Sequence, residues 1–250
     1  MTAMSADHFT PVAGQYATFR PSYPDELFDW LAGIAPQRGV AWDCGAGNGQ
    51  ATVALAKRFK HVLGTDISAA QLAAAPTLPN IEYRVASAEA CGLPDGSADL
   101  VTVAQAMHWF DLPKFYAEVR RVLKPRGALA AWGYNRLLIA QPDIQKLVDR
   151  FYEEKIGAYW PVERAHVENG YRDLPFPFPR INVPQFSLHK DWSREQLLGY
   201  LRSWSAVGRF KAVNGYDPVD ALAEEIAVFW TEDRTCRVEW PLFMHAGQVN

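Results

Sequence analysis

A short glycine-rich segment is the strongest candidate for a binding site in this chain, together with an acidic residue directly before it and a second one farther along the sequence. The segment is Cys44-Gly45-Ala46-Gly47-Asn48-Gly49, and Asp43 stands directly before it. Because glycine has no side chain, the backbone of such a loop can approach a ligand closely. Asp66 follows the first glycine after about 20 residues, at the end of an apolar run, where a carboxylate can accept both hydroxyls of a ribose. The spacing therefore predicts a site for a ligand that contains a nucleoside.

Two features of the loop distinguish between candidate ligands. A dinucleotide-binding pattern needs Gly or Ala at position 50, where this chain has Gln50. The carboxylate of Asp43 would also repel a pyrophosphate, whereas it tolerates the ammonium group of S-adenosylmethionine, which has no phosphate. The loop therefore favours S-adenosylmethionine over NAD.

The elements that must position this loop alternate between short apolar runs and helical patterns. Strands are predicted at 40–44, 61–65, 81–86, 98–104 and 128–132. Helices are predicted at 50–59, from an N-cap at Ser68 to residue 75, and at about 113–123. Parallel strands joined by helices need right-handed crossovers. This order predicts an α/β fold with a Rossmann-like, doubly wound sheet and the loop at its carboxyl edge.

The second half of the chain is less regular. Helices are predicted at 143–156, 194–207 and 218–230, strands at 181–189 and 236–244, and no regular structure at 157–180, which is rich in proline and aromatic residues. We expect this half to complete a mostly parallel seven-stranded sheet with an antiparallel edge strand and to cover its active face with helices and aromatic side chains. We interpret residues 1–250 as a single domain, with a ligand-binding core at 1–135 and a covering region at 136–250.

Composition and charge argue against several classes of partner. Lys and Arg number 25 and Asp and Glu 28, so the formal charge of −3 gives no electrostatic reason to expect nucleic acid or an anionic membrane. Cys44, Cys91 and Cys236 form no CxxC pair and no Cys/His spacing typical of a metal site, so we expect no metal. No segment has the length of a signal-peptide core or a membrane span, so we expect a cytoplasmic protein. A monomer and a homodimer both remain open.

On these segments the sequence resembles the class I S-adenosylmethionine-dependent methyltransferases, from about Phe9 to Gly133. Residues 40–49 look like the first motif of that family, 64–68 like its ribose motif, 86–90 like its adenine-contacting motif, 99–110 like the fourth strand and the active-site loop, and 123–127 like the turn before the fifth strand. In that turn Arg126 stands where the family usually has glycine. The resemblance implies methyl transfer from S-adenosylmethionine, with S-adenosylhomocysteine as the product.

The segment from Tyr16 to Pro24 narrows the resemblance to a small-molecule branch of type 11-like enzymes, similar to trans-aconitate methyltransferases. The resemblance to this branch implies that Tyr16 and Arg20 close over the cofactor, and a guanidinium can pair bidentately with the methionine carboxylate. The predicted cofactor-binding residues are Tyr16, Arg20, Asp43, Gly45, Gly47, Asn48, Asp66, Ile67, Ala88, Glu89 and Gln105.

Candidates for the acceptor side come from the loop after the fourth strand and from the second half. His108 is the candidate general base, because that loop faces the methyl group in this fold, and a role in shaping the pocket is the alternative. Predicted substrate contacts are His108, Trp109, Tyr134, Trp160 and Trp204, with Tyr159, His166 and Arg209 as further candidates. We expect in-line displacement onto a small molecule that bears a carboxylate or a hydroxyl.

Three other functions stay open at this point. The first is an NAD-dependent oxidoreductase, although no second nucleotide-binding half follows. The second is a protein that binds S-adenosylmethionine without catalysis. The third is methylation of nucleic acid or protein, which the net acidity and the lack of a basic tail disfavour.

Overall fold

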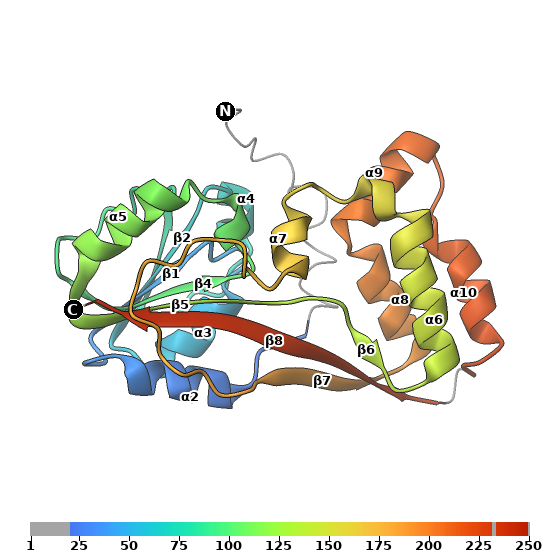
Figure 1. Ribbon diagram of the computed structural model, residues 1–250, viewed down its shortest axis with the longest axis horizontal. Helices are drawn as coiled ribbons and strands as arrows, with labels where there is room; N and C mark the ends of the chain where they lie inside the picture. The colour runs from blue at the N-terminus through green and yellow to red at the C-terminus, as the bar shows by residue number, and fades with distance from the viewer. Residues whose placement is uncertain (1–20, 232–233, 250) are drawn as a thin grey trace.

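The computed structural model describes residues 21–231 and 234–249 (Figure 1). Within these residues a mixed sheet follows the order β3-β2-β1-β4-β5-β8-β6, with β7 paired to β8 beside this path. The strands are β1 (Val40–Cys44), β2 (His61–Asp66), β3 (Ile81–Val85), β4 (Ala98–Ala104), β5 (Leu123–Tyr134), β6 (Leu138–Ile139), β7 (Ser187–Trp192) and β8 (Cys236–Gln248). β1 to β5 pair in parallel and β8 runs antiparallel to β5. The predicted Rossmann-like mixed sheet is confirmed, and β7 is an addition to it.

Helices from the first half cover both faces of the parallel strands. They are α2 (Asp25–Ile34), α3 (Gln50–Ala56), α4 (Ala69–Ala73) and α5 (Leu112–Val122). Leu27 of α2 and Leu55 of α3 are buried in one core cluster with Leu100 of β4. On the opposite face Val119 of α5 is buried with Val101 of β4. Consecutive strand residues thus face different helices, which explains why these strands are apolar on both sides.

The second half forms a group of helices at one end of the sheet. It contains α6 (Pro142–Arg150), α7 (Arg164–Glu168), α8 (Arg194–Arg202), α9 (Ser205–Asn214) and α10 (Val219–Ala227). Figure 1 shows α6, α8, α9 and α10 packed together beyond β6, with α7 between this group and the sheet. A separate aromatic core joins the group to β7 and β8 through Trp192 and Trp240, whose ring centroids are 4.8 Å apart. No helix of the described residues combines the length and apolar character needed to cross a membrane.

Several boundaries differ from the prediction for physical reasons. The helix predicted at 194–207 is two helices, because the Ser203 hydroxyl donates a hydrogen bond to the carbonyl of Tyr200 (2.6 Å) where α8 ends. The strand predicted at 181–189 begins only at Ser187, since Pro184 precedes it and cannot donate to a ladder. The segment predicted to be irregular, 157–180, contains α7 and a 3₁₀ turn, η5 (Gly157–Tyr159). A π-helical turn, η4 (Phe151–Lys155), follows α6, and α2 has no counterpart in the prediction.

One long strand belongs to both parts of the molecule. Residues 242–248 of β8 pair with β5 in the core, while residues 236–241 pair with β7 and 238–239 with β6. β8 therefore runs from the parallel strands to the helical group, as Figure 1 shows. This strand fixes the distance between the carboxyl edge of the sheet and the helices that face it.

Candidate functional site

The loop after β1 turns through three glycines with left-handed backbone, Gly45 (φ 71°), Gly47 (φ 55°) and Gly49 (φ 81°). A Cβ atom at Gly45 would lie 2.6 Å from the Cβ of Ala106, and one at Gly49 would lie 2.3 Å from the hydroxyl of Tyr83. At Gly47 a Cβ would meet no atom of residues 21–231 or 234–249 within 4 Å. Packing within the protein therefore requires two of the glycines, whereas Gly47 borders open space.

The end of β2 holds this loop in place. The carbonyl of Thr65 accepts hydrogen bonds from the backbone N–H groups of Gly45 (2.8 Å) and Ala46 (2.9 Å). The carboxylate of Asp66 accepts one from the N–H of Gly47 (2.9 Å) and one from that of Ser68 (2.8 Å). Each oxygen of Asp66 accepts one of these two bonds, so lone pairs remain for the hydroxyls of a ligand.

Asp43 lies beneath the loop. Its side chain is 1% exposed, and its two oxygens accept hydrogen bonds from the hydroxyls of Thr52 on α3 (2.6 Å) and Thr102 on β4 (3.0 Å). Burial raises the pKa of Asp43 to about 6. The structure thus places the predicted cofactor contact in a position where it holds β1, α3 and β4 together under the loop.

Other predicted cofactor residues surround the loop. Asn48 is partly exposed in the turn between Gly47 and Gly49, and Ile67, beside Asp66, is 42% exposed. Gln50 donates from its side chain to the carbonyl of Pro21 (3.2 Å), so it ties the start of α3 to the chain before α2. Tyr16 and Arg20 lie outside the described residues.

The segment after β3 carries Ala88 and Glu89, the predicted adenine contacts. Ala88 is buried, and the carboxylate of Glu89 accepts a hydrogen bond from the N–H of Asp111 at the start of α5 (3.0 Å). Glu89 therefore connects this segment to the loop after β4.

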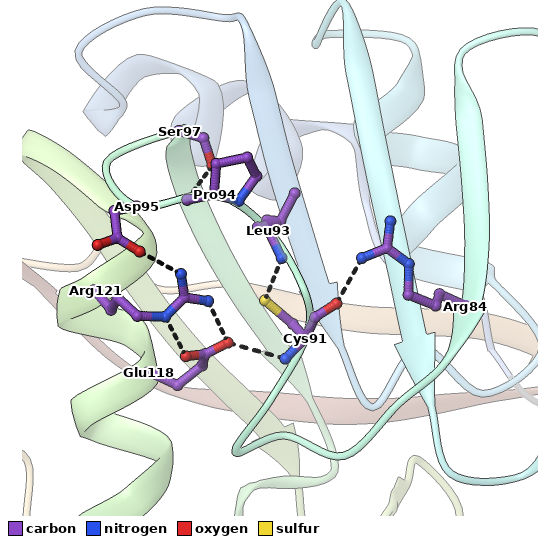
Figure 2. Close-up of polar contacts among 8 residues, drawn as sticks. All are labelled: Arg84, Cys91, Leu93, Pro94, Asp95, Ser97, Glu118 and Arg121. Carbon is purple, nitrogen blue, oxygen red and sulfur yellow. Dashed lines mark hydrogen bonds and ion pairs between the residues drawn. The ribbon is translucent and has the colours of Figure 1, made fainter.

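A polar network holds the same segment against α5 (Figure 2). The N–H of Cys91 donates to Glu118 (2.9 Å), and its carbonyl accepts from Arg84 (2.8 Å). Arg121 donates twice to Glu118 and once to Asp95 (2.6 Å). The hydrogen bonds from Arg121 lower the pKa of Glu118, so the carboxylate stays ionised in this cluster. The network accounts for the fixed position of the segment that bears Ala88 and Glu89.

A cleft opens between the carboxyl edge of the sheet and the helical group. It contains about 950 Å³ of empty space, part of it open to solvent. The predicted residues that line it are Gln105, His108, Trp109, Tyr134, Trp160 and Trp204. These side chains come from the end of β4, a 3₁₀ turn after it (η3, Met107–Trp109), the end of β5 and the second half. The structure thus brings all five predicted substrate residues into one cleft.

Three further candidates do not line this cleft in the described structure. His166 pairs with Asp173 (2.6 Å), and the hydroxyl of Tyr159 accepts a hydrogen bond from Asn214 (2.9 Å). Arg209 lies on α9, whose first residue, Ser205, lines the cleft, but Arg209 itself does not. Tyr152, Arg136 and Arg164 also line the cleft, and the sequence did not predict this. For the two arginines, the signal in the sequence was that each lies close to an aromatic residue predicted to contact the substrate.

His108 contacts a buried tyrosine. The Nδ1 atom of its ring lies 2.8 Å from the hydroxyl of Tyr171, whose side chain is fully buried and whose backbone is left-handed (φ 58°). A bulky residue adopts this conformation only where its surroundings impose it. Burial, assisted by the charges of Arg164 and His166, lowers the pKa of His108 to about 3. His108 is therefore neutral at neutral pH and is a weak base, which favours the alternative prediction that it shapes the pocket.

Comparison with known proteins decides the family. A family model for the methyltransferase domain matches residues 42–131. A Dictyostelium discoideum protein described as a methyltransferase is 38% identical over 245 residues, which covers 95% of this chain and 93% of that protein. This chain belongs to the class I S-adenosylmethionine-dependent methyltransferases.

Two other methyltransferases extend the comparison. A Schizosaccharomyces pombe protein, described as an uncharacterized methyltransferase, is 30% identical over 200 residues, 78% of this chain and 77% of its own. A solved structure described as a type II methyltransferase from Anaeromyxobacter dehalogenans is 44% identical, with a TM-score of 0.86 over 92% of this chain and 98% of that one. This coverage includes both the sheet and the helical group, so this methyltransferase shares its whole arrangement with that protein.

Proposed function

We propose that this methyltransferase transfers the methyl group of S-adenosylmethionine to a small molecule bound in the cleft. The observation that carries the proposal is the position of the cleft, which joins the end of β4 to a wall of aromatic side chains. Aromatic walls with a few polar groups are typical of sites that bind small molecules. The formal charge of −3 gives no electrostatic support for a nucleic-acid substrate.

The residues on the β1 and β2 side fit S-adenosylmethionine. Open space beside Gly47 admits a ligand next to the backbone, and Asp66 can accept ribose hydroxyls while it still holds Gly47. The exposed side chain of Ile67 offers an apolar surface for a flat ring beside that carboxylate. When bound, the cofactor supplies a methyl group attached to a positively charged sulfur.

The residues of the cleft orient the acceptor and exclude water. Gln105 has a left-handed backbone (φ 58°) and donates from its side chain to the carbonyl of Tyr134 (3.2 Å), so it joins the ends of β4 and β5 into a fixed floor. Trp160 and Trp204 form a wall, with ring centroids 5.6 Å apart. Holding an acceptor in line and away from water accounts for much of the rate enhancement of such a displacement. Neutral His108 orients the acceptor through a hydrogen bond in this scheme.

The test is incubation of the enzyme with S-adenosylmethionine labelled in its methyl group and with extracts of small metabolites. We expect a labelled small molecule, identified by mass spectrometry, and no label in protein or nucleic acid. The matched control is Asp66→Ala, which removes the ribose acceptor and should form no product. Label found only in macromolecules would contradict the proposal, and cofactor binding without any labelled product would favour a non-catalytic binding protein.

A further inference from the structure

One arginine of the cleft keeps most of its hydrogen-bonding groups unused. The Nε atom of Arg164 donates to the hydroxyl of Tyr152 (3.1 Å), and its guanidinium carbon lies 5.0 Å from the ring centroid of Trp160. Its two terminal nitrogens have no partner among residues 21–231 and 234–249, and no carboxylate oxygen of these residues lies within 4.0 Å of them. The guanidinium is therefore held by the aromatic rings while its fork of N–H groups stays available.

The other cleft arginine differs. Arg136 forms an ion pair with Glu153 (2.6 Å), and its guanidinium carbon lies 4.3 Å from the ring centroid of Tyr152. Its charge is therefore already compensated by a carboxylate. Among the described residues that line the cleft, this contrast singles out Arg164 as the cation that lacks a direct acidic partner.

The charges around Arg164 leave it only partly compensated. Glu168 accepts a hydrogen bond from the hydroxyl of Tyr152, so this carboxylate reaches Arg164 only through that hydroxyl. His108 is neutral, and the charge of Arg164 contributes to the low pKa of this histidine. Arg164 is half-buried, and a charge that is partly withdrawn from water is stabilised by an ionic partner. The cleft beside His108 therefore favours an anionic group.

A second observation points to a polar ligand in the same place. The indole N–H of Trp160 is buried and has no hydrogen-bond partner among the residues that the structure describes, although Trp160 lines the cleft. The side-chain oxygen of Asn135, another lining residue, is also buried without a partner in the described part of the chain. Buried polar groups are nearly always bonded in native proteins, so both require an explanation. A ligand with an anionic group would accept a hydrogen bond from the indole N–H, and a hydroxyl or amine on the same ligand would donate one to the oxygen of Asn135.

We propose that the methyl acceptor carries a carboxylate, which the two terminal nitrogens of Arg164 bind bidentately. Its flat apolar body lies against Trp160 and Trp204. A planar guanidinium matches the geometry of a carboxylate, and its position over an aromatic ring fixes it before the ligand arrives. This inference rests on the proposed small-molecule function and adds the chemical class of the acceptor.

Calorimetry on the enzyme saturated with S-adenosylhomocysteine tests the inference. The ligands to compare are trans-cinnamate and phenylacetate, each with its primary amide. We expect the carboxylates to bind at least about tenfold more tightly than the amides, because an ionised acceptor makes the stronger hydrogen bonds. In Arg164→Gln this preference should disappear, while the affinity for S-adenosylhomocysteine changes by less than about twofold.

Arg136→Gln is the matched control, because it removes a cleft guanidinium that is already paired. This variant should keep the preference for carboxylates, and Arg164→Lys should keep part of it, since the charge remains but the fork is lost. Equal binding of acids and amides, an unchanged preference in Arg164→Gln, or no binding of either carboxylate at roughly 10 mM would overturn the inference.

The two proposals fail separately. If metabolite extracts yield labelled products without a carboxylate or its methyl ester, the role of Arg164 is refuted while small-molecule transfer stands. If carboxylates bind through Arg164 but no small molecule becomes labelled, the proposed function is refuted while the binding site stands.

Discussion

The glycine loop and the aromatic wall of the cleft are held together in different ways. On the side of the glycine loop the framework is mostly backbone, with the N–H groups of Gly45 and Ala46 bonded to one carbonyl and that of Gly47 bonded to Asp66. On the other side the framework is side chains, in which the rings of Tyr152, Trp160 and Trp204 pack against one another. The loop is held by adjacent strand ends, whereas the three rings come from separate segments of the second half: η4, the residues before α7 and a residue between α8 and α9.

This difference predicts which positions tolerate substitution and which do not. A backbone framework is defined by conformations that only certain residues adopt, so its sequence is constrained at each position. A wall of side chains can be replaced one residue at a time without moving the sheet. The comparison suggests that the glycine loop determines the cofactor class and that the aromatic wall determines the acceptor.

The largest effect should come from the loop itself, at Gly49. We expect Gly49→Ala to lower the free energy of unfolding by about 3 kcal/mol, since the new Cβ meets Tyr83 and the left-handed backbone becomes strained. Gly47→Ala should lower it by only about 1 kcal/mol, because its Cβ has open space. Urea denaturation measures both.

The double variant Gly49→Ala/Tyr83→Phe is the control for the Gly49 prediction. It should recover part of the stability, because the hydroxyl nearest to the new Cβ is absent. Equal losses at Gly47 and Gly49 would show that packing does not distinguish the two glycines.

The next effect concerns Asp66 on the same side. Asp66→Ala should weaken binding of S-adenosylhomocysteine well over tenfold, to about a hundredfold, through the loss of charge-assisted hydrogen bonds. Calorimetry on a variant whose circular dichroism matches the wild type measures this loss. Asp95→Ala is a suitable control, since it removes an exposed carboxylate from the network around Arg121. Unchanged affinity in folded Asp66→Ala would remove this residue from the cofactor site.

The smallest effect concerns His108 on the acceptor side and depends on pH. Its pKa of about 3 lies below the 6.5 of an unperturbed histidine, so below pH 6.5 the unfolded chain binds more protons there than the folded protein does. The stability that depends on neutral His108 is therefore present above pH 6.5 and is lost as the pH falls. Between pH 7 and pH 5 the wild type should lose about 1 to 2 kcal/mol more than His108→Gln.

Urea denaturation at several pH values measures this difference. Asp43, whose raised pKa acts in the opposite direction, is present in both proteins and cancels in the comparison. Parallel stability curves for the two proteins would mean that His108 titrates normally in the folded state.

The sequence was sufficient for the sheet wherever apolar runs end at clear breaks. β4 has the predicted bounds, and β1 and β2 match to within one residue. Local patterns did not reveal the break between α8 and α9, which depends on a side-chain hydrogen bond of Ser203. The irregular segment at 157–180 was harder still, since α7 is a short helix whose only buried residue is Val167.

For the site, it was easier to predict which residues lie there than which groups their side chains are bonded to. His108, Trp109 and Trp160 were predicted as cleft residues from their type and position, and they line one cleft. Whether a charged side chain is free or already bonded depends on neighbours far away in sequence. Asp43 is bonded to Thr102 and Arg136 to Glu153, whereas Arg164 has no acidic partner in the described structure, and no spacing rule distinguishes these cases.

The position of β8 in the chain has a consequence for biosynthesis. Of all the described elements it leaves the ribosome last, yet β5, β6 and β7 all pair with it. Until residues 236–248 emerge, the nascent polypeptide exposes the edge of β5, and an open edge of this kind invites association with other chains. Chaperone binding to the nascent chain should therefore persist until translation has passed these residues, and the acceptor cleft forms only after that point.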